Sequence, residues 1–234
     1  MTNDFWSDYR RLVARLMPPL GPGDGVPEAE IEAAETRLGV KMPTLLREFY
    51  ALAGKREDIN GVHNRLVSLE NLKVDQNKLV FYEENQGVVL WGVDIQNLEN
   101  IDPSVFMAEY QATLVWDADH NHLSAFLKAM LFWQAVNGGM PYSGIGTATS
   151  EAIALAGTDW ELVDLSRDST LWRNRVQMRD GQVLFISGND PDPQVHGGGR
   201  TKADFLAVAK AFDVYWDYST LDEEPDEELD EEDE

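Results

Sequence analysis

Residues 81–93 read FYEENQGVVLWGV, two apolar runs separated by a polar break. The full runs, residues 79–82 and 88–93, are short and rich in β-branched and aromatic side chains, as strands are. A glycine inside the break allows the backbone to bend there. We interpret residues 84–87 as the turn of a strand pair and expect Trp91 to enter the core. A catalytic or binding loop is the alternative interpretation of the same stretch.

The segments on both sides of these strands have the apolar period of helices. Apolar residues recur every three or four positions in residues 4–17, 28–38, 43–53, 123–134 and 201–212. Further strands are expected at residues 66–69, 105–110, 112–116 and 158–165, and Asp180-Gly181 between two alternating runs predicts a hairpin. The order is helices, strands, helix, strands, helix. Because regular β-α-β alternation is absent, this order favours an α+β fold over a doubly wound sheet.

Acidic residues dominate the composition. The chain of 234 residues carries 42 Asp and Glu against 19 Lys and Arg, a net charge of −23. Eleven carboxylates lie in residues 221–234, which we expect to be a disordered acidic tail. The other 31 still leave residues 1–220 at −12. This charge argues against binding a nucleic-acid backbone and favours a basic partner, or serves solubility alone.

The same composition bears on location. Cysteine is absent, which excludes disulfides and thiolate metal sites and fits a reducing, cytoplasmic environment. The N-terminal residues are amphipathic and interrupted by charge, unlike a signal peptide. Since no stretch approaches the ~20 apolar residues of a membrane helix, we expect no membrane association.

The letters DADHNH, ending at His122, combine carboxylates with imidazoles. Oxygen and imidazole ligands suit Mn²⁺, Zn²⁺ or Mg²⁺, so Asp117, Asp119, His120 and His122 form the candidate metal site of a hydrolase. The alternative, which we favour, is a strand-to-helix loop in which Asp119 or Asn121 caps the next helix.

A second polar segment, DPDPQVHGGGR, ends at Arg200. Glycines before a helix can cradle phosphate, although the spacing of a Walker loop is absent. We favour a mobile loop between hairpin and helix, in which Asp190 and Asp192 would attract a cation or a basic residue. The sequence YSGIG at residues 142–146 lacks the preceding strand of a nucleophile elbow, so no nucleophilic site is predicted.

Four motifs in order resemble the SUKH superfamily of fungal cell-wall regulators and bacterial immunity proteins. The first is IEAAETRLGVKMPTLLREFY, residues 31–50, in which Met42 stands where Leu is usual. The second is residues 81–93, with their Gly and Trp-Gly. Residues 123–127 and 201–206 are similar to recurring helix starts of the family. The resemblance covers about residues 28–212 and leaves out the N-terminal helix, expected at residues 3–17, and the tail.

This resemblance implies a single domain over residues 1–220, with a curved, mainly antiparallel sheet and helices packed around it. It also implies a non-enzymatic, cytoplasmic protein-binding module. In bacteria such a module is often an immunity protein that binds and neutralises a cognate toxin, frequently a nuclease. The resemblance carries over no catalytic residue, metal or cofactor. A regulatory interaction scaffold without a toxin partner is the alternative, and a metal-dependent hydrolase is a third, less favoured, hypothesis.

Charge gives this expectation a physical basis. An acidic inhibitor can imitate the phosphate backbone that a nuclease binds, and opposite charges speed association. We therefore expect a cognate basic toxin, or another protein, as the partner, and neither nucleic acid nor membrane. The candidate partner-binding residues are Glu83, Glu84, Asp117, Asp119, Asp190 and Asp192.

Overall fold

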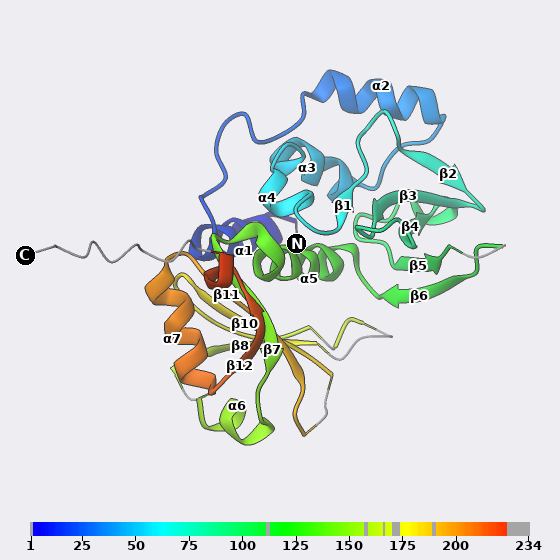
Figure 1. Cartoon of the computed structure of the whole chain (residues 1–234). Helices are drawn as coiled ribbons and strands as arrows, with labels where there is room; N and C mark the ends of the chain where they lie inside the picture. The colour runs from blue at the N-terminus through cyan, green and yellow to red at the C-terminus, as the bar shows by residue number, and fades with distance from the viewer. Residues whose placement is uncertain are drawn as a thin grey trace, which may run out of the picture.

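The computed structural model describes residues 2–110, 113–156, 159–165, 167–169, 174–188 and 191–223. It contains two antiparallel six-stranded sheets with helices between and around them (Figure 1). Sheet A is built from residues 65–120 and sheet B from residues 142–219. The α+β class is confirmed. The expected single curved sheet is wrong, because the strands before and after the central helix form two separate sheets, with an isolated bridge between His120 and Ser169.

Helices precede sheet A and supply much of the core. They are α1 (Thr2–Leu16), α2 (Glu28–Leu38), α3 (Thr44–Ala53) and the one-turn α4 (Glu57–Asn60). Helix α1 buries Tyr9, Leu12 and Leu16, one face at the helical period. Gly39 ends α2 in the left-handed conformation, with φ 69°, and donates its N–H to the carbonyl of Glu35. The helices predicted in this region are therefore confirmed.

Sheet A has the order β1-β3-β4-β5-β6, with β2 beside β3. Gly87, with φ 72°, lies in the turn between β3 and β4, so the predicted turn is confirmed. The strand expected at residues 66–69 contributes only its first residue, and the one expected at 112–116 begins only at its last. The elements are β1 (Arg65–Leu66), β2 (Lys73–Asp75), β3 (Lys78–Glu83), β4 (Val89–Asp94), the 3₁₀ helix η1 (Ile95–Asn97), β5 (Val105–Glu109) and β6 (Trp116–His120).

Helix α5 (Leu123–Gln134) lies between the two sheets (Figure 1). The ring of Phe126 is 5.4 Å from Phe81 and 5.7 Å from Trp91, both of sheet A. Nearer the other end, the ring of Trp133 is 5.3 Å from Phe185 of sheet B. One hydrophobic cluster therefore joins the helices, sheet A and one face of sheet B. The helix ends in a wide turn, η2 (Ala135–Gly139), where the sequence predicts its end.

Sheet B has the order β12-β7-β11-β10-β9-β8. Its second face packs against helices α6 and α7 in a separate cluster that includes Ile153, Leu184 and Phe212. The hairpin predicted at Asp180-Gly181 joins β9 and β10 and is confirmed. The elements are β7 (Tyr142–Thr147), α6 (Ser150–Ala156), β8 (Glu161–Asp164), β9 (Arg175–Arg179), β10 (Gln182–Ser187), β11 (Gln194–Gly199), α7 (Lys202–Phe212), β12 (Tyr215–Ser219) and η4 (Thr220–Glu223).

The glycine-rich segment before α7 is a buried strand, so its prediction as a mobile or phosphate-binding loop is wrong. As β11 it pairs with β10 on one side and β7 on the other. A Cβ at Gly197 would lie 2.4 Å from the ring of Trp216, and one at Gly199 would lie 2.4 Å from the backbone N of Phe205. The rings of Phe205 and Trp216 stack with centroids 4.9 Å apart. These glycines therefore allow an aromatic pair to lie close to the sheet.

The C-terminal region begins with a well-capped helix. Thr201 and Asp204 form the predicted capping box at the start of α7. The acidic tail begins later than expected, because residues 221–223 belong to η4 and Asp222 accepts a hydrogen bond from the Ser219 N–H at 2.8 Å. Residues 224–234 lie outside the described part of the chain. Among the described helices, none combines the length and apolar character needed to cross a membrane.

Candidate interaction surface

The pairing register separates the two faces of sheet A. Trp91 pairs with Tyr82 and Met107, and this row faces the core. Leu90 pairs with Glu83 on β3. It points the other way, because successive residues of a strand alternate between faces. We call that side the outer face. Its residues are Arg65, Lys73, Asp75, Lys78, Val80, Glu83, Leu90, Gly92, Asp94, Phe106, Ala108, Trp116 and Ala118.

The centre of the outer face is apolar. Val80, Leu90 and Ala108 are buried there, yet they belong to neither hydrophobic cluster. The apolar surface continues to the end of the sheet, where Val88 is 48 % and Tyr110 57 % exposed. These two residues are neighbours, since the Tyr110 N–H donates to the Val88 carbonyl at 2.7 Å. An apolar centre that reaches an exposed aromatic residue is typical of protein interfaces.

A tryptophan ring lies across this face. A Cβ at Gly92 would lie 3.3 Å from Cη2 of Trp116 and 3.0 Å from Cβ of Lys78. Because β5 separates β4 from β6, the half-buried indole must span β5 to approach Gly92. The Lys78 ammonium in turn lies 4.5 Å from the ring of Phe106. The pair Trp91-Gly92 thus has two roles: the first residue fills the core, and the second leaves room on the outer face.

A hollow of about 410 Å³ opens on the outer face. Val80 and Leu90 line it together with Arg65, Glu83 and Tyr110. The Arg65 Nε lies 3.3 Å from a carboxylate oxygen of Glu83, and both side chains are more than a third exposed. Such an exposed pair contributes little to stability and can exchange its partners with those of a bound protein.

Negative charge concentrates in this part of the chain. Residues 61–122 hold ten Asp and Glu but three Lys and Arg. Each of these three bases already lies within 4.0 Å of a carboxylate, as Lys78 does with Asp94 at 3.0 Å. The backbone N–H of Gln96 and the Lys78 ammonium hold the pKa of Asp94 below its usual value. Residues 61–122 therefore carry a net charge of −7, and such an excess attracts basic groups.

Two of the predicted binding residues lie at this surface. Glu83 is on the outer face, and Glu84 follows it in the turn. One carboxylate oxygen of Glu84 accepts hydrogen bonds from the backbone N–H groups of Gln86, at 2.9 Å, and Val88, at 3.4 Å. Glu84 therefore shapes the turn, and Glu83 is the carboxylate that faces the hollow.

The other two predicted residues of sheet A lie elsewhere. Asp117 is exposed but pairs with Met107, which places it on the opposite face from Glu83. Asp119 is 1 % exposed, and its Oδ2 accepts a hydrogen bond from the Trp91 indole N–H at 2.8 Å. Asp119 is thus part of the interior and offers no surface to a partner.

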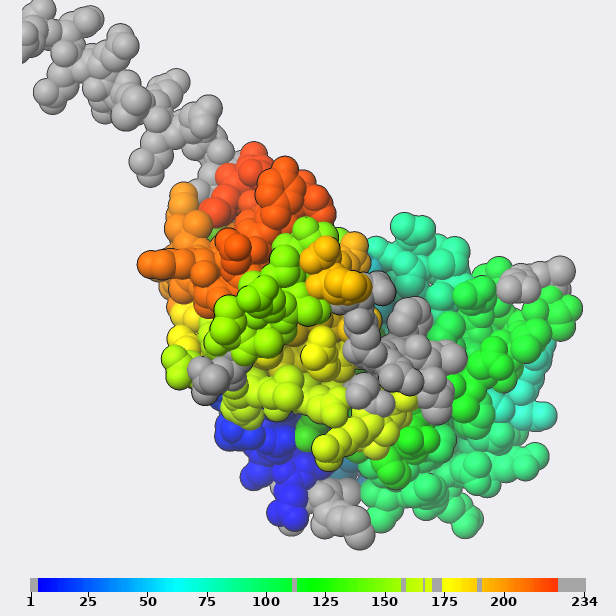
Figure 2. Space-filling view, turned by 90° about the horizontal axis from the view of Figure 1, so that it is seen from below, coloured from blue at the N-terminus to red at the C-terminus, as the bar shows by residue number. Residues whose placement is uncertain are grey.

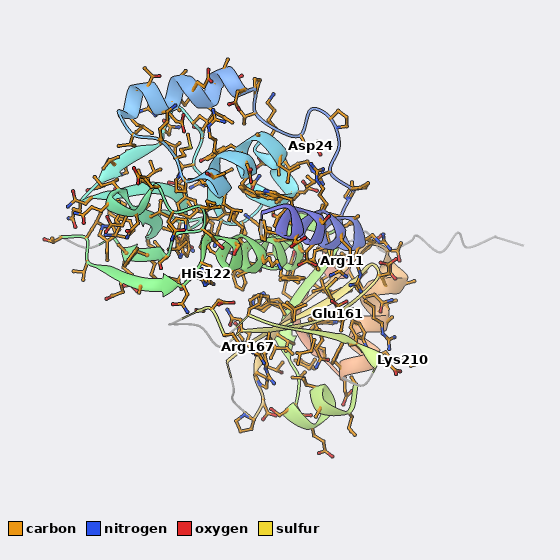
Figure 3. The ribbon with its side chains drawn as sticks, turned by 180° about the vertical axis from the view of Figure 1, so that it is seen from behind. Arg11, Asp24, His122, Glu161, Arg167 and Lys210 are labelled. Carbon is orange, nitrogen blue, oxygen red and sulfur yellow. The ribbon has the colours of Figure 1, made fainter. Side chains whose placement is uncertain are left out.

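The candidate metal ligands do not converge. An irregularity in the pairing of β5 and β6 leaves both Asp119 and His120 buried, with the His120 Nδ1 3.2 Å from Asp119 Oδ2. Asp117 and His122 are exposed instead, and His122 lies by the start of α5 (Figure 3). Within the described ranges, no three His, Asp or Glu side chains are placed to hold one metal ion.

The predicted helix cap at Asn121 or Asp119 is wrong as well. The N-cap residue of α5 is His122, whose side chain makes no capping hydrogen bond. Asp102, from the loop before β5, takes that role, because its carboxylate accepts from the Ser124 N–H at 2.8 Å and from the Ser124 hydroxyl at 2.6 Å. The His122 Nδ1 lies 4.0 Å from the same carboxylate. The sequence predicts a cap from a residue next to the helix, whereas the capping carboxylate comes from another segment of the chain.

The two remaining predicted residues precede β11 in the sequence. Asp192 is exposed and lies just before β11 of sheet B, far from Glu83 in the sequence. Asp190 lies outside the described residues. In the space-filling view, sheet A lies at one end of the molecule, and β12 and α7 lie at the other (Figure 2). The structure thus places Glu83 and Glu84 together, with Asp117 on the opposite face of the sheet and Asp119 in the interior.

Sequence reasoning missed the apolar half of the surface. The sequence predicts Trp116, Tyr110 and Leu90 only as strand residues, and it predicts the strand that contains Trp116 four residues too early. The available signal was the alternation of Leu90 and Gly92 with Trp91 and Val93, which assigns the first pair to the face away from the core.

Comparisons of the chain with protein-family models, curated proteins and solved structures found no match. The likeness to the SUKH superfamily therefore stays a prediction that rests on four sequence motifs.

Proposed function

We propose that this chain is a non-enzymatic protein-binding module that holds a basic partner protein on the outer face of sheet A. The observation that carries the proposal is the combination of an apolar centre with carboxylates in the most acidic part of the folded chain. Binding energy in protein interfaces comes mainly from such apolar and aromatic centres, and charges at the rim speed encounter. Tyr110 and Val88 would provide the contact area, and Glu83 would pair with a base.

The chemistry of the carboxylates supports binding over catalysis. Glu83 is engaged with Arg65, and Glu84 holds the backbone of its own turn. An acid–base pair in a hydrolase needs two carboxyl groups that face one substrate with separated pKa values. These two side chains instead present a fixed negative rim beside an apolar floor.

The specific form of the proposal is an immunity protein that neutralises a cognate basic toxin, such as a nuclease, in the cytoplasm. Its supports are the net charge of −12 over residues 1–220 and the resemblance of residues 28–212 to the SUKH superfamily. A regulatory scaffold would use the same face with a partner that is not toxic. Expressing the product of a neighbouring gene alone separates the two forms, because only a toxin arrests growth without this chain.

Paired lysine substitutions test the proposed face. Val88→Lys/Tyr110→Lys places two charges on exposed positions of the outer face, and Leu155→Lys/Tyr215→Lys does so at α6 and β12, where the side chains are 73 % and 74 % exposed. Each variant is co-expressed with the products of the genes adjacent to its own, and complexes are isolated at low salt. We expect the first variant to lose a basic partner that the second retains.

Two results would count against the proposal. One is a complex that survives the outer-face substitutions and is lost in the control pair, which would move the interface to sheet B. The other is an association rate that does not fall as salt rises, since a charge-steered encounter is screened by salt.

A further inference from the structure

A second hollow, of about 470 Å³, lies between helices α3 and α4 and the segment after β1. It shares Leu66, Val67 and Ser68 with the hollow on the outer face. The two hollows therefore lie on either side of one short segment. A protein seated on the outer face would have this second hollow within reach of a long side chain.

A buried amide defines the polar end of the second hollow. Asn60, which lines it, is 6 % exposed. Its Nδ2 donates to the Ala53 carbonyl at 2.6 Å, which fixes the orientation of the amide. Its Oδ1 is buried and has no hydrogen-bond partner in the described structure. Because an unsatisfied buried oxygen is costly, a donor that enters the hollow would be stabilised there.

The charge around the hollow is negative. Glu30, Glu57 and Glu70 line it, and none of the three is in an ion pair with another described residue. Lys55 also lines it and offsets part of this charge. Arg56 lines the hollow as well, but its guanidinium is already bound by two carboxylates.

Those carboxylates are Asp58, at 2.7 and 2.8 Å, and Asp24, at 3.0 Å. Asp24 lies on the loop between α1 and α2 (Figure 3). Both hold the pKa of Arg56 above its usual value, most strongly through the hydrogen bond that Arg56 donates to Asp58. The Arg56 charge is thus neutralised within the chain, and the three glutamates keep the hollow attractive to a cation.

The walls are apolar. Val26, Leu66 and Leu69 line the hollow together with the Tyr50 ring. The Tyr50 hydroxyl donates to the Val67 carbonyl at 2.6 Å, so this polar group is satisfied within the chain. A ligand that fits these walls has a hydrocarbon stem and carries its charge at one end.

We propose that this hollow receives an arginine side chain of the bound protein. The propyl stem lies between the apolar walls, and the guanidinium donates to Asn60 Oδ1 and to the surrounding glutamates. Arginine fits better than lysine, because its planar fork directs several N–H donors to different acceptors at once. Buried arginines are frequent anchors of protein interfaces. The inference that the arginine belongs to a bound protein rests on the proposed function. The inference that the hollow accepts a guanidinium rests on the residues that line it.

The test uses the full chain and a small probe. N-acetyl-arginine amide is titrated into ¹⁵N-labelled protein, with N-acetyl-citrulline amide as the uncharged probe of the same shape. We expect the arginine probe to shift the amide signals of Gly54, Asn60 and Leu69, and the citrulline probe to bind about tenfold more weakly.

Charge-matched variants make the test specific. Glu30→Gln/Glu57→Gln/Glu70→Gln should weaken the arginine probe about tenfold. Glu99→Gln/Glu151→Gln/Asp192→Asn removes the same charge from exposed positions elsewhere and should change binding by less than about twofold.

Equal binding of the two probes, equal effects of the two variants, or signal shifts confined to the outer face would overturn the proposal. So would tighter binding of N-acetyl-lysine amide. Because no partner protein is present, these results do not depend on the outer-face interface. Loss of the arginine site would leave that interface intact as a proposal, and loss of the interface would leave the arginine site.

Discussion

Sheets A and B are alike on one face and different on the other. Each contributes to the cluster around α5 through its inner face. The second face of sheet B packs against α6 and α7 and buries Leu184, Ile186 and Phe212. The outer face of sheet A has a hollow instead, and its apolar surface reaches exposed Val88 and Tyr110. The second face is therefore packed against helices in sheet B, whereas in sheet A its apolar centre is buried without joining either cluster and its end exposes Val88 and Tyr110.

Charge follows the same division. Residues 61–122 have ten carboxylates to three Lys and Arg, whereas residues 140–219 have eleven to seven. The acidic excess of the folded chain is thus densest in the segment that builds sheet A, although Arg65, Lys73 and Lys78 on the outer face each lie within 4.0 Å of a carboxylate. Such an excess favours solubility and can also steer a basic partner toward this sheet.

Close packing on the second face of sheet B should make that side the less tolerant of added volume. A Cβ at Gly146 would lie 2.0 Å from the Tyr215 carbonyl oxygen, so we expect Gly146→Ala to cost about 3 kcal/mol or more. Gly92→Ala meets only side chains and a carbonyl at 3.0 Å or beyond, and should cost about 1 kcal/mol. Urea unfolding measures both, with Gly21→Ala as the neutral control. Equal losses of stability for Gly146→Ala and Gly92→Ala would show that the two sheet faces tolerate added volume equally.

Acid should weaken the junction between sheet B and α5. Burial, with a smaller contribution from His63, lowers the pKa of His196 to about 4. Between pH 6.5 and 4 the unfolded chain therefore binds a proton that the folded chain does not, and stability falls as pH falls. The expected loss is up to about 3 kcal/mol. Urea midpoints from pH 7 to 4.5 should show this loss in the wild-type chain.

Two histidine variants identify the group responsible. His196→Gln should flatten the pH dependence, because it removes the buried imidazole beside Trp133. His122→Gln changes an exposed residue at the end of α5 that lies beside sheet A. This variant should leave the pH dependence of stability unchanged. If His196→Gln keeps the full slope, another group titrates.

A buried hydrogen bond joins Trp91 to Asp119 on the inner face of sheet A. Trp91→Phe removes the donor to Asp119 and should cost about 1–3 kcal/mol, because a buried carboxylate loses a partner. Trp133→Phe, whose indole N–H lies 3.2 Å from the part-buried His63, should cost less. A reversed order would show that the Asp119 bond is not what stabilises sheet A.

The smallest effect is expected on the outer face itself. Val88→Lys/Tyr110→Lys should change the free energy of unfolding by no more than about 0.5 kcal/mol, since both side chains are about half exposed. A large loss of stability would mean that these side chains complete the fold and are not held available for a partner.

Local signals in the sequence predicted most elements but not their assembly. The αL glycine at position 39, the Thr201–Asp204 capping box and the Asp180-Gly181 hairpin are confirmed because each depends on neighbouring residues alone. The sequence does not predict β11, because the role of Gly197, room for the Trp216 ring, involves a residue nineteen positions away. The division into two sheets depends on pairing partners, which periodicity does not specify.

The candidate site shows the same limit. The acidic turn at Glu83-Glu84 is visible in the sequence, and the structure places it at the outer face. Asp119 has the same chemistry but is buried beneath Trp91, because an irregularity in β6 turns it inward. Charge alone could not distinguish the two, since exposure depends on register.

Binding of the partner by the two lysine-pair variants tests the central claim most directly. Titration calorimetry of the purified partner should show an affinity at least about a hundredfold weaker for Val88→Lys/Tyr110→Lys, as expected when an interface centre is charged. For Leu155→Lys/Tyr215→Lys the affinity should stay within about threefold of the wild-type value. An unchanged affinity in the first variant, or the larger loss in the second, would contradict the assignment of the outer face of sheet A as the binding surface.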